Sequence, residues 1–256
     1  MLSQGKMIAA NRRISKFDRE KLDTPITVRV IFQKTGNLQY FSHLDLQRTW
    51  QRVLVRASIP MWYTQGFNPH SKIVFGVPLP VGSEGMEEMV DLRIDRQITP
   101  AEIKAQLNAE LTSEMQVSEV YIPTAPFSDI AWGVYQMTLK TPGSPTDVAN
   151  AINAMFAPDA EPVVMTKRSK SGDKDVNILP MIHDLKATAD CNGLIQIRAT
   201  LRAGNTENLN PEYLIKAMRD KLGILPEDGA PGEVWYRILR IGFHDATGVE
   251  TGKWFR

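Results

Sequence analysis

The segment YFSHLDLQRTWQRVLVRASIPMWYTQGFNPHSK (Tyr40–Lys72) contains the pattern from which the rest of the fold can be worked out. Ser42 and Asp45 have the spacing of a capping box, in which each side chain binds the main-chain N–H of the other residue. Apolar residues then follow at helical spacing and predict one buried helix face: Leu46, Trp50, Val53, Leu54 and Ala57. We expect a helix that begins after Ser42 and ends before Pro60, followed by a turn at QGFNPHSK.

Together with this helix, the flanking segments predict the order of elements β-α-β-β-α-β. Alternation and β-branched residues predict a strand at Ile26–Lys34 before the helix. Thr99, Pro100 and Glu102 have the pattern of a second helix start. Three more strands are expected: IVFGVPL (Ile73–Leu79) and EEMVDLRID (Glu87–Asp95), paired as a hairpin, and MQVSEVYIP (Met115–Pro123) at the end.

The second half of the chain repeats this order. The expected elements are a strand at Gly133–Lys140, a helix capped by SPTD (Ser144–Asp147), a strand broken by a charged turn within Pro162–Ile182, a strand at Leu194–Ala203, a helix capped by Asn210 with Pro211 at its first position, and a strand at Glu233–Phe243. We therefore predict an α+β protein with tandem ferredoxin-like domains, each an antiparallel sheet with two helices on one face.

The domain boundaries follow from this reading. Residues 25–123 form the first predicted domain and residues 132–247 the second, joined at PTAPFSDIA (residues 123–131), where two prolines interrupt the pattern. Residues 1–24 are expected to be a mildly basic, flexible tail, and residues 248–256 a C-terminal tail.

The composition limits the classes of function. The chain is 43% hydrophobic and 23% charged, with a net charge of +1, so any site for a polyanion must come from local clustering of cations. The single Cys191 excludes an intramolecular disulfide and a Cys-rich metal or iron–sulfur site within this chain, and it favours a cytoplasmic location. No apolar run reaches the length of a membrane span, so we expect no membrane partner.

No sequence motif for a nucleotide, a dinucleotide or a catalytic zinc ion is present, and we expect no cofactor and no bound metal. The acidic bend at Glu84, Glu87 and Glu88 leaves a Mg²⁺ site as an alternative. A charged rim of a hairpin is the interpretation that we favour for these three residues.

Two clusters of cations point to a polyanion. Arg48, Arg52 and Arg56 are four residues apart on one helix face, and no acid lies between Gln47 and Arg56. Guanidinium groups in such a row suit contacts with phosphates. The nucleic-acid-binding residues that we predict are these arginines with Gln65, Asn68 and Lys72 in and after the turn, and Lys167, Arg168, Lys170 and Lys174 in the segment KRSKSGDK. A solvated helix face and a mobile hairpin tip remain the alternatives for the two clusters.

The histidine turns raise the alternative of an enzyme. His43 begins the predicted helix, and His70 follows an Asn-Pro turn that Gly66 allows to approach a ligand closely. A metal-independent endoribonuclease could use His43 with Asp45 or Ser42, or His70 with Lys72, for proton transfer. The candidate catalytic residues are therefore His43, Asp45 and His70, although Ser42 and Asp45 are also explained as a helix cap.

The same stretches resemble a known family. Lys34 and Gly36, the segment Phe41–Asp45, the turn Gly66–His70, the bend Pro78–Gly82 and the basic segment Lys167–Ile182 occur in the order typical of a radical-SAM-associated family, domain of unknown function 2344. The resemblance is strong over residues 26–95 and around 167–182. The chain resembles the freestanding form, because it lacks the CxxxCxxC motif that would bind a cluster in a radical SAM enzyme.

The resemblance implies a role connected with RNA. Together with the cations, it predicts an RNA-binding accessory protein in the processing or modification of tRNA or rRNA, with no specificity for DNA. A separate radical SAM enzyme or a ribonuclease is an expected protein partner. The other hypotheses are the endoribonuclease described above and a protein-interaction module without affinity for nucleic acid.

Overall fold

The computed structural model describes residues 18–167, 172–204, 207–229 and 232–248. In its first half, the elements are β1 (Lys21–Lys34), α1 (His43–Arg56), β2 (Ile73–Phe75), β3 (Ser83–Arg96), α2 (Pro100–Asn108) and β4 (Val117–Tyr121). The second half contains β5 (Ile130–Lys140), α3 (Pro145–Met155), β6 (Val164–Lys167), β7 (Lys174–Asn177), β8 (Ile182–Ala189), β9 (Ile195–Arg202), α4 (Glu212–Leu222) and β10 (Trp235–Asp245). The protein is thus a mixed α/β structure with a mostly antiparallel sheet.

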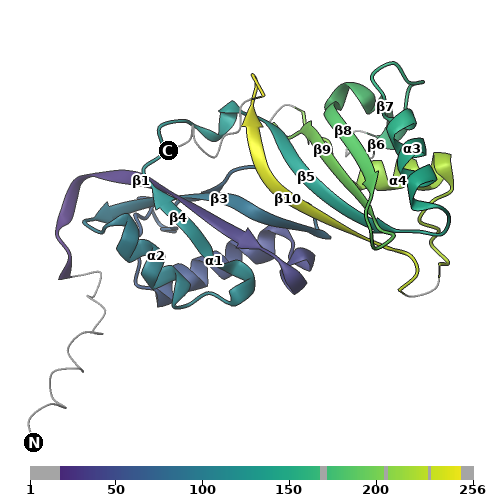
Figure 1. Cartoon of the computed structure of the whole chain (residues 1–256). Coiled ribbons are helices and arrows are strands. Elements are labelled where there is room, and N and C mark those ends of the chain that lie inside the picture. Colours follow the sequence, from purple (N-terminus) through teal and green to yellow (C-terminus); the bar gives the residue numbers. More distant parts are fainter. Residues whose placement is uncertain (1–17, 168–171, 205–206, 230–231, 249–256) are drawn as a thin grey trace, which may run out of the picture.

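One sheet of eight strands runs through both halves of the described chain (Figure 1). Its order is β4-β1-β3-β10-β5-β9-β8, and β2 pairs with the far end of β3. The halves join where Ser83–Gly85 of β3 pair in parallel with Ile238–Arg240 of β10, whereas the other strand pairs of the sheet are antiparallel. A separate two-stranded hairpin consists of β6 and β7.

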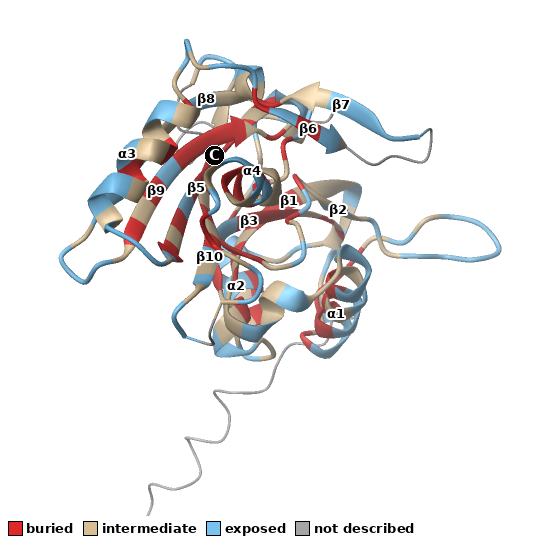
Figure 2. Cartoon of the chain, turned by 90° about the vertical axis from the view of Figure 1, so that its right-hand side faces the viewer, coloured by how far each residue is buried: buried red, intermediate tan, exposed pale blue. Residues whose placement is uncertain are grey.

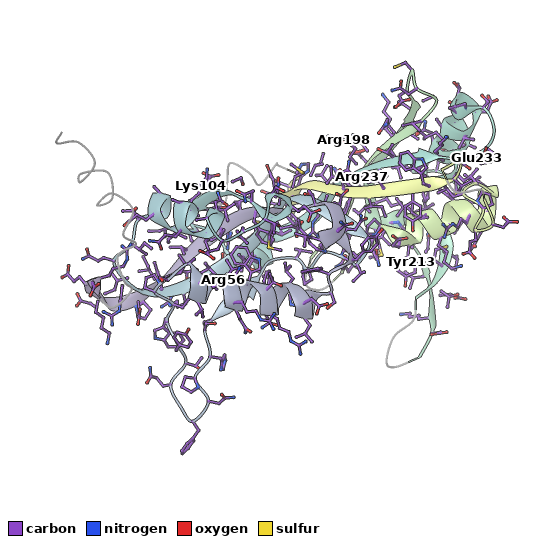
Figure 3. All side chains as sticks on the ribbon, turned by 90° about the horizontal axis from the view of Figure 1, so that it is seen from below. Arg56, Lys104, Arg198, Tyr213, Glu233 and Arg237 are labelled. Atoms are coloured by element: carbon purple, nitrogen blue, oxygen red, sulfur yellow. The ribbon has the colours of Figure 1, made fainter. Side chains whose placement is uncertain are left out.

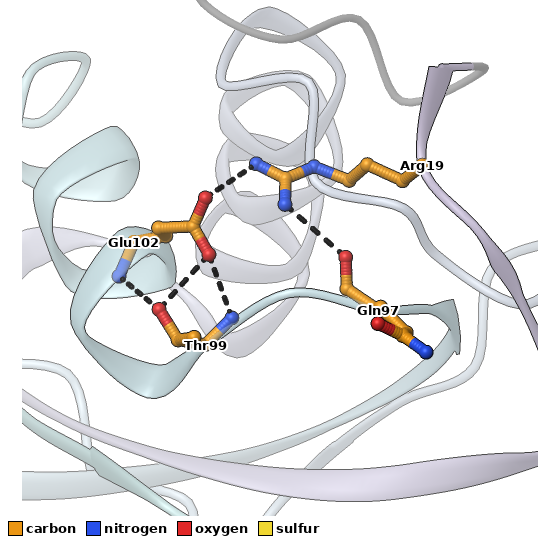
Figure 4. Close-up of polar contacts among 4 residues, drawn as sticks. All are labelled: Arg19, Gln97, Thr99 and Glu102. Carbon is orange, nitrogen blue, oxygen red and sulfur yellow. Dashed lines mark hydrogen bonds and ion pairs between the residues drawn. The ribbon is translucent and has the colours of Figure 1, made fainter.

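The predicted helix starts have a clear structural basis. Ser42 and Asp45 form the capping box at the start of α1, and Thr99 and Glu102 form the one at α2, where Pro100 is the first helical residue. Figure 4 shows the second of these boxes, which Arg19 extends by donating to Glu102 at 3.0 Å. Both boxes satisfy main-chain N–H groups that a helix start leaves unpaired.

Each half has its own apolar core, which Figure 2 shows as buried strand and helix faces. Trp50 and Leu54 of α1 pack in one core with Val90 and Leu92 of β3. In the second core, α3 and α4 pack against one face of β5 and β9. This face contains Met137, Leu139 and Ile197, among other residues. These helices therefore leave the opposite face of β5 and β9, with Gln136 and Arg198, without a covering helix among the described residues.

Several predicted boundaries need correction. The expected broken strand within Pro162–Ile182 is the β6–β7 hairpin, and the sheet strand at this place in the order is β8, at Ile182–Ala189. β2 ends at Phe75 rather than Leu79, and β1 begins at Lys21, within the segment expected to be a tail. At α4 the N-cap is Pro211, and the Asn210 side chain accepts from the N–H of Glu212 at 3.0 Å.

Ion pairs cross the junction between β3 and β10. The carboxylate of Glu88 accepts from Arg240 at 3.0 and 2.5 Å, and both side chains are buried. Glu84 is likewise buried, where it pairs with Arg237 and accepts from the N–H of Gly36 at 2.7 Å. Two of the three acids considered for Mg²⁺ are thus ion-pair partners of arginines, and no cluster of metal ligands occurs among the described residues.

Within the part of the chain that the structure describes, none of the helices is both long and apolar enough to pass through a lipid bilayer.

Candidate nucleic-acid interface

The arginines of the predicted stripe lie on the exposed side of α1. Arg48, Arg52 and Arg56 are all exposed, in line with the helical spacing. Arg56, however, forms an ion pair of 3.3 Å with Glu110 and donates to the Glu110 carbonyl at the same distance. The spacing within the helix does not reveal this acid, which follows α2 in the sequence. Arg48 and Arg52 remain without an ion pair among the described residues.

The turn at QGFNPH belongs to a projecting ribbon, which we call the arm (Trp62–Lys72). Figures 2 and 3 show it as the loop that leads into β2 and extends away from the body of the molecule. At its base Trp62 donates to the Arg93 carbonyl at 2.7 Å, and Tyr63 pairs with Ser71 across the ribbon. The predicted residues Gln65, Asn68, His70 and Lys72 are therefore all exposed along the arm.

The structure does not assemble the predicted catalytic residues into one group. His43 packs its ring edge against Phe75, with centroids 5.2 Å apart. His70 Nδ1 lies 3.2 Å from both Thr64 Oγ1 and the Asn68 carbonyl. Asp45 is held in the helix cap, where the Ser42 hydroxyl donates to it at 2.6 Å and lowers its pKa. No hydrogen bond among the described residues joins His43, Asp45 and His70.

The second basic cluster is only partly described. Lys174 is exposed on β7. Arg168 and Lys170 lie outside the described residues, and the Lys167 side chain is not described. Figures 1 and 2 show α1 in the first half of the molecule and the β6–β7 hairpin in the second half.

A third basic surface lies on the helix-free face of the second half, and the sequence reasoning missed it. Strand pairing places Lys186 of β8 directly opposite Arg198 of β9, and Arg198 opposite Gln136 of β5. The next row contains Thr188, Gln196 and Thr138. We call these six residues the sheet face. Like charges directly opposite on a sheet destabilise it, so the Lys186–Arg198 pair favours an anionic ligand.

The sheet face forms a shallow hollow of about 410 Å³, lined by all of its residues except Thr138, together with Asp184 and Ile197. Its polar groups are held in place. Thr138 donates to Gln196 Oε1 at 2.9 Å, and Gln196 Nε2 donates to Asp190 at 3.0 Å. Asp184 accepts from Thr200 at 3.1 Å. The hollow therefore presents the cations of Lys186 and Arg198 beside the ordered amide of Gln196 and the ordered carboxylate of Asp184.

Aromatic and cationic groups flank the hollow. The Arg202 guanidinium lies 3.9 Å from the centroid of the Trp132 ring, and the His183 ring is 5.0 Å from the same tryptophan. Figure 3 shows Arg198 and Arg237 on the side of the sheet away from Tyr213 of α4. Arg202 also pairs with Glu207 at 3.7 Å and Arg237 pairs with Glu84, whereas Arg198 has no ion pair among the described residues.

The signal that could have revealed this surface is the alternation in LIQIRATLRA. Gln196, Arg198, Thr200 and Arg202 are two residues apart and share one strand face, whereas the residues between them are apolar. The cross-strand partner Lys186 could not be assigned from the sequence, because β8 was not recognised as a strand.

Comparison with protein families gives one match. The model of a family described as an uncharacterized protein conserved in bacteria (DUF2344) matches residues 27–211. This span begins in β1 and includes the arm, Lys186 and Arg198. No curated protein matches the sequence.

Proposed function

The chain belongs to the DUF2344 family, and we propose that it is an RNA-binding accessory protein in the processing or modification of tRNA or rRNA. The observation that carries this proposal is the Lys186–Arg198 pair on the sheet face. Both side chains are exposed, and no ion pair involves either of them among the described residues. A phosphate of an RNA backbone would form an ion pair with both cations.

The chemistry around the pair suits RNA in particular. Gln136, Gln196 and Thr188 offer amide and hydroxyl groups that can bind base edges and the ribose 2′-hydroxyl, a group that DNA does not have. With a net charge of +1, the chain has no overall attraction to polyanions, so binding has to be local. Arg48, Arg52, Lys72 and Lys174 would add contacts with phosphates outside the sheet face.

The proposal also includes two ferredoxin-like domains. Its support is the strand order, which is β4-β1-β3-β2 in the first half and β10-β5-β9-β8 in the second, with two helices packed on each half. In this interpretation, the β6–β7 hairpin is an insertion between α3 and β8. Sheets of this kind bind single-stranded RNA on the face that the helices leave open.

As an accessory protein in the cytoplasm, the chain would deliver or position RNA for a separate enzyme, either a radical SAM enzyme or a ribonuclease. Radical chemistry would belong to that partner, because the single Cys191 cannot bind an iron–sulfur cluster alone.

The experiment that tests this proposal is a binding titration of the purified chain with fluorescein-labelled tRNA and with a generic single-stranded RNA. The test variant is Lys186→Glu/Arg198→Glu, and the matched control is Lys216→Glu/Lys221→Glu on the exposed side of α4. We expect the test variant to lose at least tenfold in affinity and the control to lose much less. Equal losses in both variants would contradict a site on the sheet face.

The same samples separate the other hypotheses. Cleavage of the RNA that is lost in His43→Ala or His70→Ala, with binding retained, would indicate the endoribonuclease. If the chain does not bind RNA at low salt, the protein-interaction module is the hypothesis that remains.

A further inference from the structure

The tip of the arm presents one aromatic side chain to solvent. Phe67 has a relative exposure of 110%, the highest among the exposed large hydrophobic residues of the described chain. A phenylalanine of this kind forgoes the free energy that burial would give it. A ligand that covers the ring would recover part of this free energy.

Hydrogen bonds join the two sides of the arm below its tip. Thr64 donates its N–H to the His70 carbonyl at 3.0 Å, and the N–H of His70 donates back to Thr64 Oγ1 at 3.1 Å. Before the tip the chain turns at Gly66, whose φ is 133°. Residues other than glycine rarely adopt this backbone conformation. At the base, Arg93 of β3 donates to the Lys72 carbonyl at 3.2 Å. The arm is thus an extension of the sheet with its own cross-strand hydrogen bonds.

The residues around Phe67 indicate which ligand fits. The arm contains no acidic residue, and its tip offers the amides of Gln65 and Asn68 and the imidazole of His70. Lys72 adds a positive charge at the base. An aromatic ring among neutral hydrogen-bonding groups and a cation matches an unpaired nucleobase, which stacks on the ring and hydrogen-bonds through its edges.

The polar groups of this tip are a poor match for the apolar surface of a protein partner. The core of a protein–protein interface is usually a patch of several apolar side chains, whereas Phe67 is flanked by glycine and asparagine. We therefore infer that the arm stacks Phe67 on an unpaired base of an RNA loop or bulge. This inference rests on the proposed function and adds to it the kind of RNA that the protein selects.

The test compares two RNAs that differ only in one unpaired base. Both RNAs have the same stem and the same loop, and one of them carries a single bulged 2-aminopurine in the stem. The variants are Phe67→Ala, Phe67→Trp as the conservative replacement, and Tyr40→Ala as a control, because Tyr40 is an exposed aromatic residue outside the arm. Phe67 has no core contacts, so its replacement should leave the fold unchanged.

We expect the wild-type chain to bind the bulged RNA more tightly and to quench the 2-aminopurine fluorescence. Phe67→Ala should lose about 5- to 150-fold in affinity for the bulged RNA, keep its affinity for the plain stem, and show no quenching. Phe67→Trp should restore both effects, and Tyr40→Ala should behave as wild type.

Two results would overturn the inference while leaving the proposed function in place. They are an unchanged preference for the bulge in Phe67→Ala, and an equal loss of affinity for both RNAs. Binding of neither RNA by the wild-type chain would overturn the proposed function, and the role of the arm in RNA recognition would fall with it.

Discussion

Buried charges occupy strand positions where alternation alone would predict apolar side chains. Arg29 and Arg240 are almost completely buried, and each contacts a carboxylate with two nitrogen atoms, that of Asp91 and that of Glu88 respectively. Arg240 also donates to the Val77 carbonyl at 2.6 Å. Bidentate pairing satisfies much of the hydrogen-bonding capacity of a guanidinium group, which makes its burial tolerable.

The Arg240–Glu88 pair gives the first prediction. Arg240→Ala should destabilise the protein by about 3–5 kcal/mol, because it leaves the Glu88 carboxylate buried without a cation. The free energy of unfolding, measured by urea denaturation at neutral pH, checks this value. As a control, Lys216→Ala removes an exposed pair with Asp220 at 2.7 Å and should cost no more than about 0.5 kcal/mol. Similar losses in the two variants would contradict the structural role of the buried pair.

Glu102 gives a prediction of pH dependence. Hydrogen bonds lower the pKa of Glu102 from 4.5 to about 2 (Figure 4). The bond from the Thr99 N–H has the largest effect, and the bond from the Arg19 side chain has the next largest. Because the pKa is lower in the folded state, the ionised carboxylate stabilises the fold above pH 4.5, and this contribution is lost as the pH falls towards 2.

In Glu102→Gln we therefore expect a lower urea midpoint than in wild type at neutral pH, with a difference that shrinks between pH 4.5 and about 2. Exposure of this side chain will keep the effect modest. A difference that stays constant over this range would show that the carboxylate charge does not stabilise the helix start.

At the scale of elements, the sequence is most informative where a local signal marks each boundary. The capping boxes at Ser42 and Thr99 gave the correct starts of α1 and α2, because a helix cap depends on residues only three apart. β8 was missed because it is an edge strand. Only Ala187 of its eight residues is buried, so the usual alternation of apolar residues is weak.

The outer edge of β8 leads to a prediction about α3. Asn153 of α3 imitates a neighbouring strand, since its Nδ2 donates to the Ala187 carbonyl at 2.9 Å and its Oδ1 accepts from the Ala187 N–H at 2.8 Å. Asn153→Ala should leave both main-chain groups without these partners, at a cost of about 1–3 kcal/mol. Amide hydrogen exchange at Ala187 should become faster, whereas Asn150→Ala, an exposed site on the same helix, should not change it. Unchanged protection in Asn153→Ala would contradict this role.

At the scale of the whole molecule, the central feature is the joining of two half-sheets. The parallel contact between Ser83–Gly85 and Ile238–Arg240 links residues far apart in the sequence. Periodicity and caps report only neighbouring residues, so they predicted the order of elements in each half but not this contact.

The salt dependence of RNA binding tests the role of the sheet face most directly. For a single-stranded RNA, the slope of log K against log salt concentration should decrease in magnitude by about 1.4 in Lys186→Ala/Arg198→Ala, which corresponds to two lost phosphate contacts. The control Lys216→Ala/Lys221→Ala should keep the wild-type slope. A wild-type slope in the Lys186/Arg198 variant, or no binding by the wild-type chain at low salt, would contradict the claim that the sheet face binds RNA.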